Sequence, residues 1–168
     1  MRYTSLAVEM LRSRAGLVFW VVILAQAALW LLVPLIFYAS PPGDVAQVLA
    51  VGREYRVGSQ FGPPLAFWLA DAAYRLAGGH MIGVYVLSQM CLVVSFWALY
   101  QFARAIAGAQ HAVLAVLLTV TITAFGFPNL EFGPAIVARP LWALVLLHYW
   151  RAVGQGQRNA WFALSIEI

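Results

Sequence analysis

The chain has 168 residues, of which 64% are hydrophobic and 10% are charged, and its mean hydropathy is +0.84. Soluble domains have about 45–50% apolar and about 25% charged residues, so this composition excludes an ordinary soluble domain and indicates an integral membrane protein. The net charge of +4 comes from ten basic residues, all arginine, scattered between apolar segments. This scatter argues against a nucleic-acid-binding protein, which would gather its basic residues on one face.

The first predicted element is a membrane-spanning helix over residues 17–37. This run contains no Asp, Glu, Lys or Arg, and it exceeds the roughly 18 apolar residues that indicate a span. A backbone in hydrocarbon must satisfy its own hydrogen bonds, so the run must be helical. It follows Arg2, Arg12 and Arg14, as in a signal peptide. It is nevertheless longer than the apolar region of about 7–15 residues found there, and we interpret it as an uncleaved anchor.

Residues 38–80 form a long loop in which we expect two short interfacial helices. The first covers residues 44–57, where apolar positions at helical spacing alternate with polar ones. The second covers residues 65–77, follows a Pro-Pro pair, and carries Asp71 and Arg75 as an i,i+4 pair. The apolar residues of the second helix are expected to form one face: Leu65, Trp68, Leu69, Ala72 and Leu76.

Three further apolar runs follow this loop. A second span is predicted over residues 81–103, which again contain no charged residue. The third run, residues 112–127, is shorter and rich in Thr, and we expect it either to span a thinned membrane or to be partly re-entrant. The fourth, residues 135–150, is interrupted by Arg139 and Pro140 near its start. The sequence therefore predicts about four spans.

The last segment predicts an incomplete fifth span. Residues 151–159 have the composition of a polar loop, and Asn159 is placed to cap a helix that starts at the next residue. The remaining run, residues 160–168, cannot cross about 30 Å of hydrocarbon at about 1.5 Å per residue. We therefore expect residues 1–168 to be the truncated, N-terminal part of one all-α, polytopic transmembrane domain.

The arginine distribution predicts that the N-terminus lies in the cytoplasm. In this orientation Glu9 is the one acid in the cytoplasmic segments, and the loop over residues 38–80 lies outside. The arginines of the cytoplasmic segments are Arg2, Arg12, Arg14, Arg104, Arg151 and Arg158. The inverse orientation leaves only four arginines inside. We expect a multi-pass protein of the plasma membrane, or of the inner membrane in a bacterium.

Asp44 and Glu131 are the candidate catalytic acids, one in each predicted outer loop. Asp44 follows the first span closely, where it can take a proton from an acceptor hydroxyl as a general base at the bilayer edge. With Gln47 three residues later it also fits a helix N-cap, and the two roles are compatible because a cap fixes the side chain. Glu131 either cooperates with Asp44, helps to hold a divalent cation, or is a solvated loop acid.

Arg139, Arg53 and Arg56 are the candidate phosphate-binding residues. Arg139 lies in the apolar flank of the fourth run, where a charge is costly and usually faces a protein interior or a cavity. Its guanidinium either binds phosphate through two parallel hydrogen bonds or extends to the membrane interface. Arg53 and Arg56 lie on the first interfacial helix, where they contact either a substrate phosphate or anionic lipid headgroups.

The sequence contains no recognisable metal or redox motif. His80, His111 and His148 do not share a spacing that zinc sites use. Cys91 is the single cysteine and lies in the middle of a predicted span, so it cannot form an intrachain disulfide. The cofactor is therefore unknown, and a divalent cation near Glu131 is the one candidate.

The order of these parts resembles the start of the polytopic glycosyltransferases of the GT-C class. It runs from an arginine-flanked anchor through an outer loop with an early Asp and two interfacial helices to the second span. The similarity is to dolichyl-phosphate-mannose protein mannosyltransferases and bacterial aminoarabinose transferases. The stretches that carry it are GDVAQ (43–47), FGPPLAFWL (61–69), PLWAL (140–144) and YWRA (149–152), together with Trp161.

The resemblance implies a transferase that moves a sugar from a polyprenyl-phosphate donor to an acceptor at the outer membrane face. In that family an Asp of the first outer loop is the proposed catalytic base, and Asp44 matches it. A second outer acid often lies near the fourth span, and Glu131 is the nearest residue to it. The implied partners are membrane lipid and the lipid-linked donor, without nucleic acid, while the acceptor is unknown.

Two other interpretations stay open. A transporter or flippase fragment predicts polar residues along mid-membrane cavities, whereas the polar residues here cluster in the outer loop. An inactive membrane remnant is the third interpretation, because Val45 stands where the family often has Glu, and Phe61 and Gly62 precede Pro63 where the family has charged residues. We expect these 168 residues to be inactive by themselves.

Overall fold

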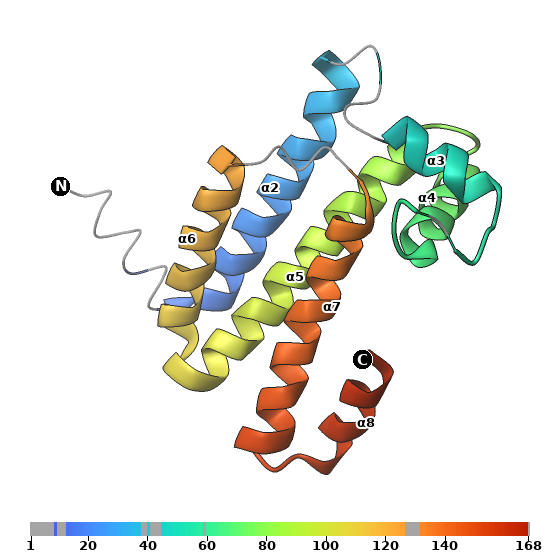
Figure 1. Cartoon of the computed structure of the whole chain (residues 1–168). Coiled ribbons are helices and arrows are strands. Elements are labelled where there is room, and N and C mark those ends of the chain that lie inside the picture. Colours follow the sequence, from blue (N-terminus) through green and yellow to red (C-terminus); the bar gives the residue numbers. More distant parts are fainter. Residues whose placement is uncertain are drawn as a thin grey trace.

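The computed structural model describes residues 9, 13–37, 40, 45–58, 60–126 and 132–167. Throughout this part of the chain the regular structure is helical, with no strand, and the all-α prediction is confirmed (Figure 1). The elements are α2 (Ala15–Phe37), α3 (Val45–Arg53), α4 (Pro64–Leu76), α5 (Ile82–Ala107), α6 (Ala109–Gly126), α7 (Pro134–Tyr149), the π-helical turn η1 (Trp150–Gly154) and α8 (Arg158–Glu167).

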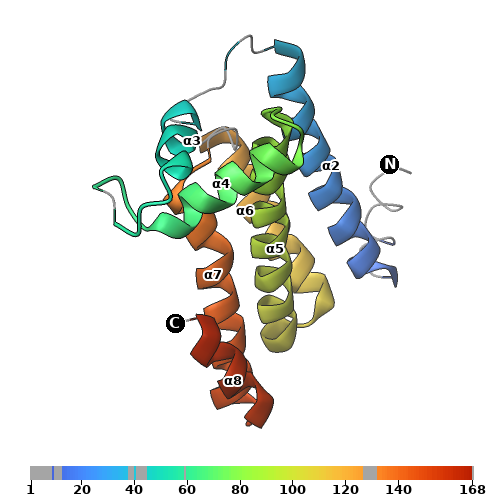
Figure 2. The ribbon, with the colours of Figure 1, turned by 90° about the vertical axis from the view of Figure 1, so that its right-hand side faces the viewer.

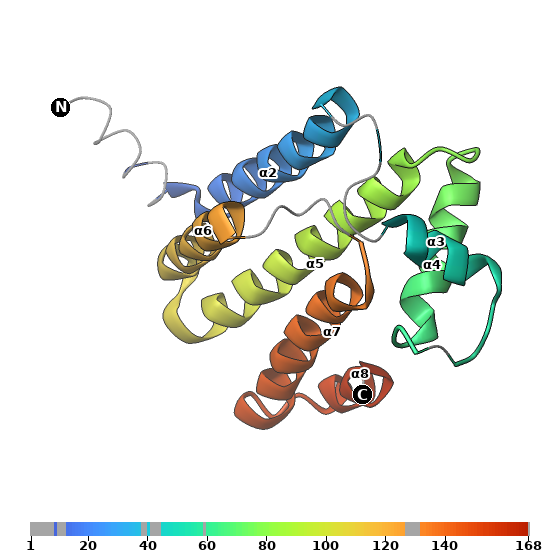
Figure 3. The ribbon, with the colours of Figure 1, turned by 45° about the horizontal axis from the view of Figure 1, so that its top comes forward.

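Helix α5 is the centre of the molecule, where it contacts α2, α4, α6 and α7. The four long helices α2, α5, α6 and α7 run alternately in opposite directions. The ends of α2 and α6 therefore lie at the same end of the bundle as the starts of α5 and α7 (Figure 1). The short helices α3 and α4 lie together at that end, which we call the α3/α4 end (Figure 2). The N-terminus of α2, the α5–α6 turn and η1 lie at the opposite end of the bundle (Figure 3).

Two of the described helices are long and apolar enough to cross a membrane, Ala15–Phe37 and Ile82–Ala107. Their 23 and 26 residues correspond to about 35 and 39 Å, more than the roughly 30 Å of hydrocarbon. The predicted helices over residues 17–37 and 81–103 are thus confirmed with slightly longer bounds. That the third and fourth runs also cross the membrane stays a prediction, because α6 and α7 are shorter.

Helix α5 extends beyond the predicted end at residue 103, through Arg104 to Ala107. Its C-cap is Gly108, whose φ of 84° is left-handed and therefore favours glycine. The continuation carries Arg104 into the last turn of the helix, where a cation is favourable near the negative end of the helix dipole.

Two buried clusters hold the helices together. The first joins α2, α5 and α6, where the ring of Phe19 stacks on that of Tyr100 at 4.5 Å between centroids. The second, which we call the α3/α4 core, joins α3, α4, α5 and α7. Its buried residues are Val45, Val48, Leu49, Ala66, Phe67, Ala70, Val84, Phe132, Ile136 and Val137.

Two glycines let α4 approach its neighbours closely. A Cβ on Gly52 of α3 would overlap the backbone carbonyl of Phe67, and a Cβ on Gly83 of α5 would overlap that of Ala73. Small residues of this kind let membrane helices pack backbone to backbone. Helix α4 is therefore wedged between α3 and α5, with no room for a side chain at either crossing.

The close packing of α4 against α3 and α5 explains why its buried face differs from the apolar face expected from the sequence. The residues that α4 buries are Ala66, Phe67, Ala70 and Asp71. Leu65 and Leu76 of the expected apolar face are 47% and 90% exposed. Close packing selects the alanine-rich side, and the bulky leucines remain on the surface.

Helix α3 is shorter than the predicted helix over residues 44–57, because it ends at Arg53. Tyr55 has a φ of 49°, a left-handed conformation in which an α-helix cannot continue. Residue 44, the expected first residue, lies outside the described residues. Of the apolar positions at helical spacing, Val45, Val48, Leu49 and Gly52 are buried, whereas Tyr55 lies beyond the helix and is 48% exposed.

The C-terminal part differs from the expectation in two places. Helix α7 passes through Arg139 and Pro140 without interruption, because a proline can be accommodated where neighbouring helices support the backbone. The expected polar loop over residues 151–159 is largely helical: η1 extends α7, and α8 begins at Arg158, so Asn159 lies inside α8 rather than capping it.

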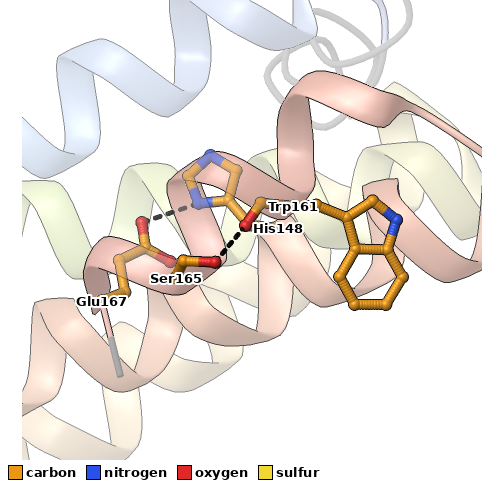
Figure 4. A network of polar contacts seen from close by, with 4 residues as sticks. All are labelled: His148, Trp161, Ser165 and Glu167. Carbon is orange, nitrogen blue, oxygen red and sulfur yellow. Dashed lines mark hydrogen bonds and ion pairs between the residues drawn. The ribbon is translucent and has the colours of Figure 1, made fainter.

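Helix α8 folds back along α7 and is joined to it by a side-chain pair. Nδ1 of His148 on α7 lies 2.7 Å from Oε1 of Glu167 on α8, and both side chains are largely buried (Figure 4). The hydroxyl of Ser165 donates to the backbone carbonyl of Trp161, one turn earlier on the same helix. The His148–Glu167 pair therefore fixes the direction in which α8 leaves the turn.

Candidate functional site

The polar centre of the α3/α4 end is a buried carboxylate on α4. The side chain of Asp71 is 1% exposed, and its Oδ2 accepts a hydrogen bond of 2.6 Å from the hydroxyl of Tyr55. The Nε of Arg75 lies 2.7 Å from the same oxygen, as predicted for this i,i+4 pair. One oxygen thus joins the end of α3 to α4.

The second oxygen of Asp71 is the unusual feature of this centre. Oδ1 is buried and has no hydrogen-bond partner within the described part of the chain. A buried carboxylate oxygen is costly without a donor, which is why nearly all such atoms in folded proteins have one.

The carboxylate of Asp71 makes the phenol of Tyr55 a weaker acid. Its hydrogen bond to Asp71, reinforced by partial desolvation, raises the pKa of Tyr55 above its ordinary value. The ring of Tyr55 is flanked by the ring of Trp68 at 6.5 Å between centroids and by the guanidinium of Arg75 at 5.6 Å. These contacts require the left-handed turn at Tyr55, which no residue pattern in the sequence signals.

Two of the three candidate phosphate-binding arginines lie near this centre. The guanidinium of Arg53 lies 5.6 Å from the ring centroid of Tyr74 on α4, a cation–π arrangement. The guanidinium of Arg56 pairs with Glu54 at 3.1 Å, with both side chains more than half exposed. An exposed pair of this kind contributes little to stability, so Arg56 can exchange Glu54 for another anion.

Arg139, the third candidate, lines a small cavity between α5, α6 and α7. It is partly buried, and the cavity has a volume of about 220 Å³. Most of the lining is apolar: Leu92, Phe96, Leu99, Phe102, Ala143 and Leu146. Arg139 takes part in none of the ion pairs formed among the described residues. The structure therefore places a guanidinium at the wall of an apolar cavity.

The two candidate acids, Asp44 and Glu131, lie outside the described residues. Their sequence neighbours do not. Val45, the residue after Asp44, is fully buried, and Phe132, the residue after Glu131, is 2% exposed. Both neighbours belong to the α3/α4 core, together with Ile136 and Val137 from the first turn of α7. The chain segments that follow the two acids are thus packed into one cluster.

A metal site is not evident in this part of the protein. Among the described residues there is no group of three or more His, Cys, Asp or Glu side chains placed to hold an ion. The histidines are spread along the bundle: His80 precedes α5, His111 bonds to the carbonyl of Ala107, and His148 is paired with Glu167.

Sequence reasoning did not identify the full role of Asp71. It predicted the i,i+4 pair with Arg75 and assigned Asp71 no further role. The sequence did not show the tertiary contact to Tyr55, nor the close packing of α4 against Gly52 of α3 and Gly83 of α5. A carboxylate within an alanine-rich helical face, Ala66, Ala70 and Ala73, was the available signal.

Comparison with known proteins identifies one family. Residues 62–167 match the family model described as dolichyl-phosphate-mannose-protein mannosyltransferase. No curated protein and no solved structure matches the chain. The matched range covers more than half of the chain, from α4 to α8, and it includes Glu131 and Arg139 but not Asp44.

Proposed function

This chain belongs to the dolichyl-phosphate-mannose-protein mannosyltransferase family, and we propose on that premise that it is part of a GT-C-type glycosyltransferase. In this proposal a sugar passes from a polyprenyl-phosphate donor to an acceptor hydroxyl at the outer face of the membrane. The family match confirms the resemblance found in the sequence, and the two long apolar helices agree with a membrane protein.

The observation that supports a single reaction centre is the shared burial of Val45 and Phe132 in the α3/α4 core. Val45 and Phe132 directly follow the two acids in the sequence, so the described neighbours of both acids lie in one cluster. Arg139 lies deeper in the bundle, because the cavity that it lines is bounded by α5 from Leu92 to Phe102. We infer that Asp44 and Glu131 serve one site at the α3/α4 end, and that Arg139 contacts the donor phosphate from inside the bundle.

The cavity beside Arg139 suits a donor that is both anionic and lipid-like. A guanidinium can hold phosphate oxygens through two parallel hydrogen bonds. The apolar side chains around it offer a surface for the first carbons of a polyprenyl chain. A second source of positive charge for the phosphate is Arg53. Arg56 can also contribute once it exchanges its exposed partner Glu54 for the phosphate.

In the proposed reaction the bond between the sugar carbon and the phosphate oxygen breaks while the acceptor oxygen bonds to the same carbon. Asp44 takes the proton of the acceptor hydroxyl as the general base. The sugar carbon develops oxocarbenium character, and Arg139 stabilises the charge that appears on the leaving phosphate. Glu131 cooperates with Asp44, or helps to hold a divalent cation near the phosphate.

Asp71 has a positioning role in this proposal. Its bonds to Tyr55 and Arg75 fix the end of α3 against α4. Because α3 begins at Val45, the same contacts hold the segment that directly follows Asp44. A base must lie within hydrogen-bond reach of the proton that it takes, so the position of α3 affects the rate even though Asp71 does not touch the substrate.

The test uses membranes that contain the product of the complete gene. The probes are polyprenyl phosphates that carry radiolabelled mannose or aminoarabinose, and the readout is label transferred to endogenous acceptors. Asp44→Asn should lower transfer by about 10²–10⁴-fold, as expected for loss of a general base. Glu9→Gln, which changes an exposed acid that precedes α2, should transfer like the wild type. Near wild-type transfer by Asp44→Asn would exclude the proposed base.

A further inference from the structure

The end of the bundle opposite the α3/α4 end contains two neighbouring cavities that share Arg104. The first, of about 530 Å³, is lined by Arg14 at the start of α2, by Arg104 in the last turn of α5, and by Ser13 and Tyr100. The second, of about 390 Å³, lies on the other side of Arg104. It is lined by Gln101, Arg104, Ala105, Arg151, Gln155 and Gln157.

The arginines of these cavities have no acidic partner among the described residues. The ion pairs formed among the described residues are those of Arg56 with Glu54, Arg75 with Asp71 and His148 with Glu167. Arg14, Arg104 and Arg151 are in none of them. Three guanidinium groups from three elements therefore surround a pair of polar cavities without a carboxylate among the lining residues. Such a site attracts an anion, and guanidinium suits the oxygens of phosphate.

The position of the cavities at the ends of the long apolar helices indicates the source of that phosphate. Arg14 directly precedes α2, and Arg104 lies in the last turn of α5, the two helices that can cross a membrane. In a membrane crossed by these two helices, the cavities would lie where the hydrocarbon ends and the lipid headgroups begin. Beside them, Leu17 and Ile106 are 45% and 55% exposed. These apolar side chains offer a surface for acyl chains, which a free phosphate would not need.

We propose that the cavities on either side of Arg104 bind the phosphate headgroup of an anionic membrane phospholipid. Arg14, Arg104 and Arg151 supply the charge, while the amide of Gln101 supplies a neutral hydrogen-bond donor. Basic pockets between membrane helices hold anionic headgroups in this way. The site is separate from the proposed transfer reaction, which uses the α3/α4 end, so either proposal can fail without the other.

The test is native mass spectrometry of the complete protein in a mild detergent. Phosphatidylglycerol and phosphatidylcholine with identical acyl chains are the two probes. The wild type should retain phosphatidylglycerol over phosphatidylcholine, and Arg104→Gln should lower phosphatidylglycerol retention by about fivefold, the contribution of one arginine near a lipid surface. Arg104→Lys should fall between the two, because it keeps the charge but loses the second parallel hydrogen bond.

The matched control is Arg158→Gln. Arg158 is an exposed arginine at the start of α8, at the same end of the bundle, and it lines neither cavity. The Arg158→Gln variant should bind phosphatidylglycerol like the wild type. Equal loss in Arg158→Gln and Arg104→Gln would overturn the proposal, because it would mean attraction by overall charge. Unchanged retention in Arg104→Gln would also overturn it, as would equally strong binding of soluble glycerol 3-phosphate, which would identify a site for free phosphate.

Discussion

The Nε of Arg75 lies 2.7 Å from Oδ2 of Asp71, although 62% of the Arg75 side chain is exposed and only 1% of the Asp71 side chain is. The pair is thus asymmetric: the acid is buried where α4 crosses α3, and the base reaches it from the surface. Tyr55 donates to the same oxygen from the end of α3. A buried charge at a helix crossing therefore depends on one exposed cation and one phenol.

This asymmetry predicts that the two partners differ in their effect on stability. Arg75→Gln leaves the buried carboxylate without its cation and should cost about 3–5 kcal/mol. Asp71→Asn removes the buried charge and leaves Arg75 in solvent, so it should cost less, about 1–3 kcal/mol. Thermal unfolding of the purified protein in detergent measures both. A larger loss in Asp71→Asn than in Arg75→Gln would contradict this ordering.

The crossing of α3 and α4 predicts a strong effect at Gly52. Gly52→Ala places a methyl group against the backbone carbonyl of Phe67 and should lower the free energy of unfolding by about 1–3 kcal/mol, as overpacking does. Gly58→Ala is the matched control, because a Cβ there meets nothing within 4 Å. Equal melting temperatures for the two variants would show that the helices do not approach as described.

The raised pKa of Tyr55 predicts a late alkaline titration. The hydrogen bond to Asp71 stabilises the neutral phenol, so the folded-state pKa of Tyr55 lies above its ordinary value of about 10. The bond therefore stabilises the fold fully below about pH 10, and this contribution is lost as the pH rises through the raised pKa. The phenolate absorbance difference between wild type and Tyr55→Phe measures the titration. A midpoint at or below the ordinary value would contradict the bond.

The cavity beside Arg139 predicts a defect in donor use. Arg139→Lys keeps the charge but loses the planar pair of donors, and Arg139→Gln loses both. Donor transfer by membranes of the complete protein should fall in the order wild type, Arg139→Lys, Arg139→Gln. The loss in Arg139→Gln should be about 10-fold or more, as for a buried charge-assisted contact to phosphate. Arg158→Gln, with the same change of charge far from this cavity, should transfer like the wild type.

The pair between α7 and α8 predicts a local change only. Glu167→Gln weakens the contact with His148, so amide hydrogens of α8 should exchange faster while those of α5 stay protected. Hydrogen exchange followed by mass spectrometry measures both regions in one experiment. Unchanged exchange in α8 would mean that its position depends on apolar packing through Leu164 and Ala160 rather than on this pair.

Much of the helical layout follows from the sequence. Uncharged runs of more than 18 residues predict α2 and α5 within a few residues, because hydrocarbon admits only a backbone that satisfies itself. The end of α3 was less predictable. Four further residues fit its helical spacing, but the left-handed turn at Tyr55 ends it, and that turn is stabilised by a contact sixteen residues away.

The candidate site was also predictable from the sequence only in part. Its residue types were visible in the sequence, since Asp44, Glu131 and Arg139 are charged residues beside apolar runs, where a charge needs a reason. The sequence also identified the family through short motifs, which the match over residues 62–167 confirms. The catalytic roles of these residues remain predictions, which the proposed variants test.

The sequence by itself determined the solvent, the class of fold and the family, because hydropathy, charge spacing and short motifs are properties of neighbouring residues. Only the tertiary structure decided which face of α4 is buried, that Asp71 rather than a leucine lies in the crossing, and that Val45 and Phe132 share one core. Those outcomes depend on how closely two backbones approach at Gly52 and Gly83. That approach is set by packing between distant segments, which no local pattern records.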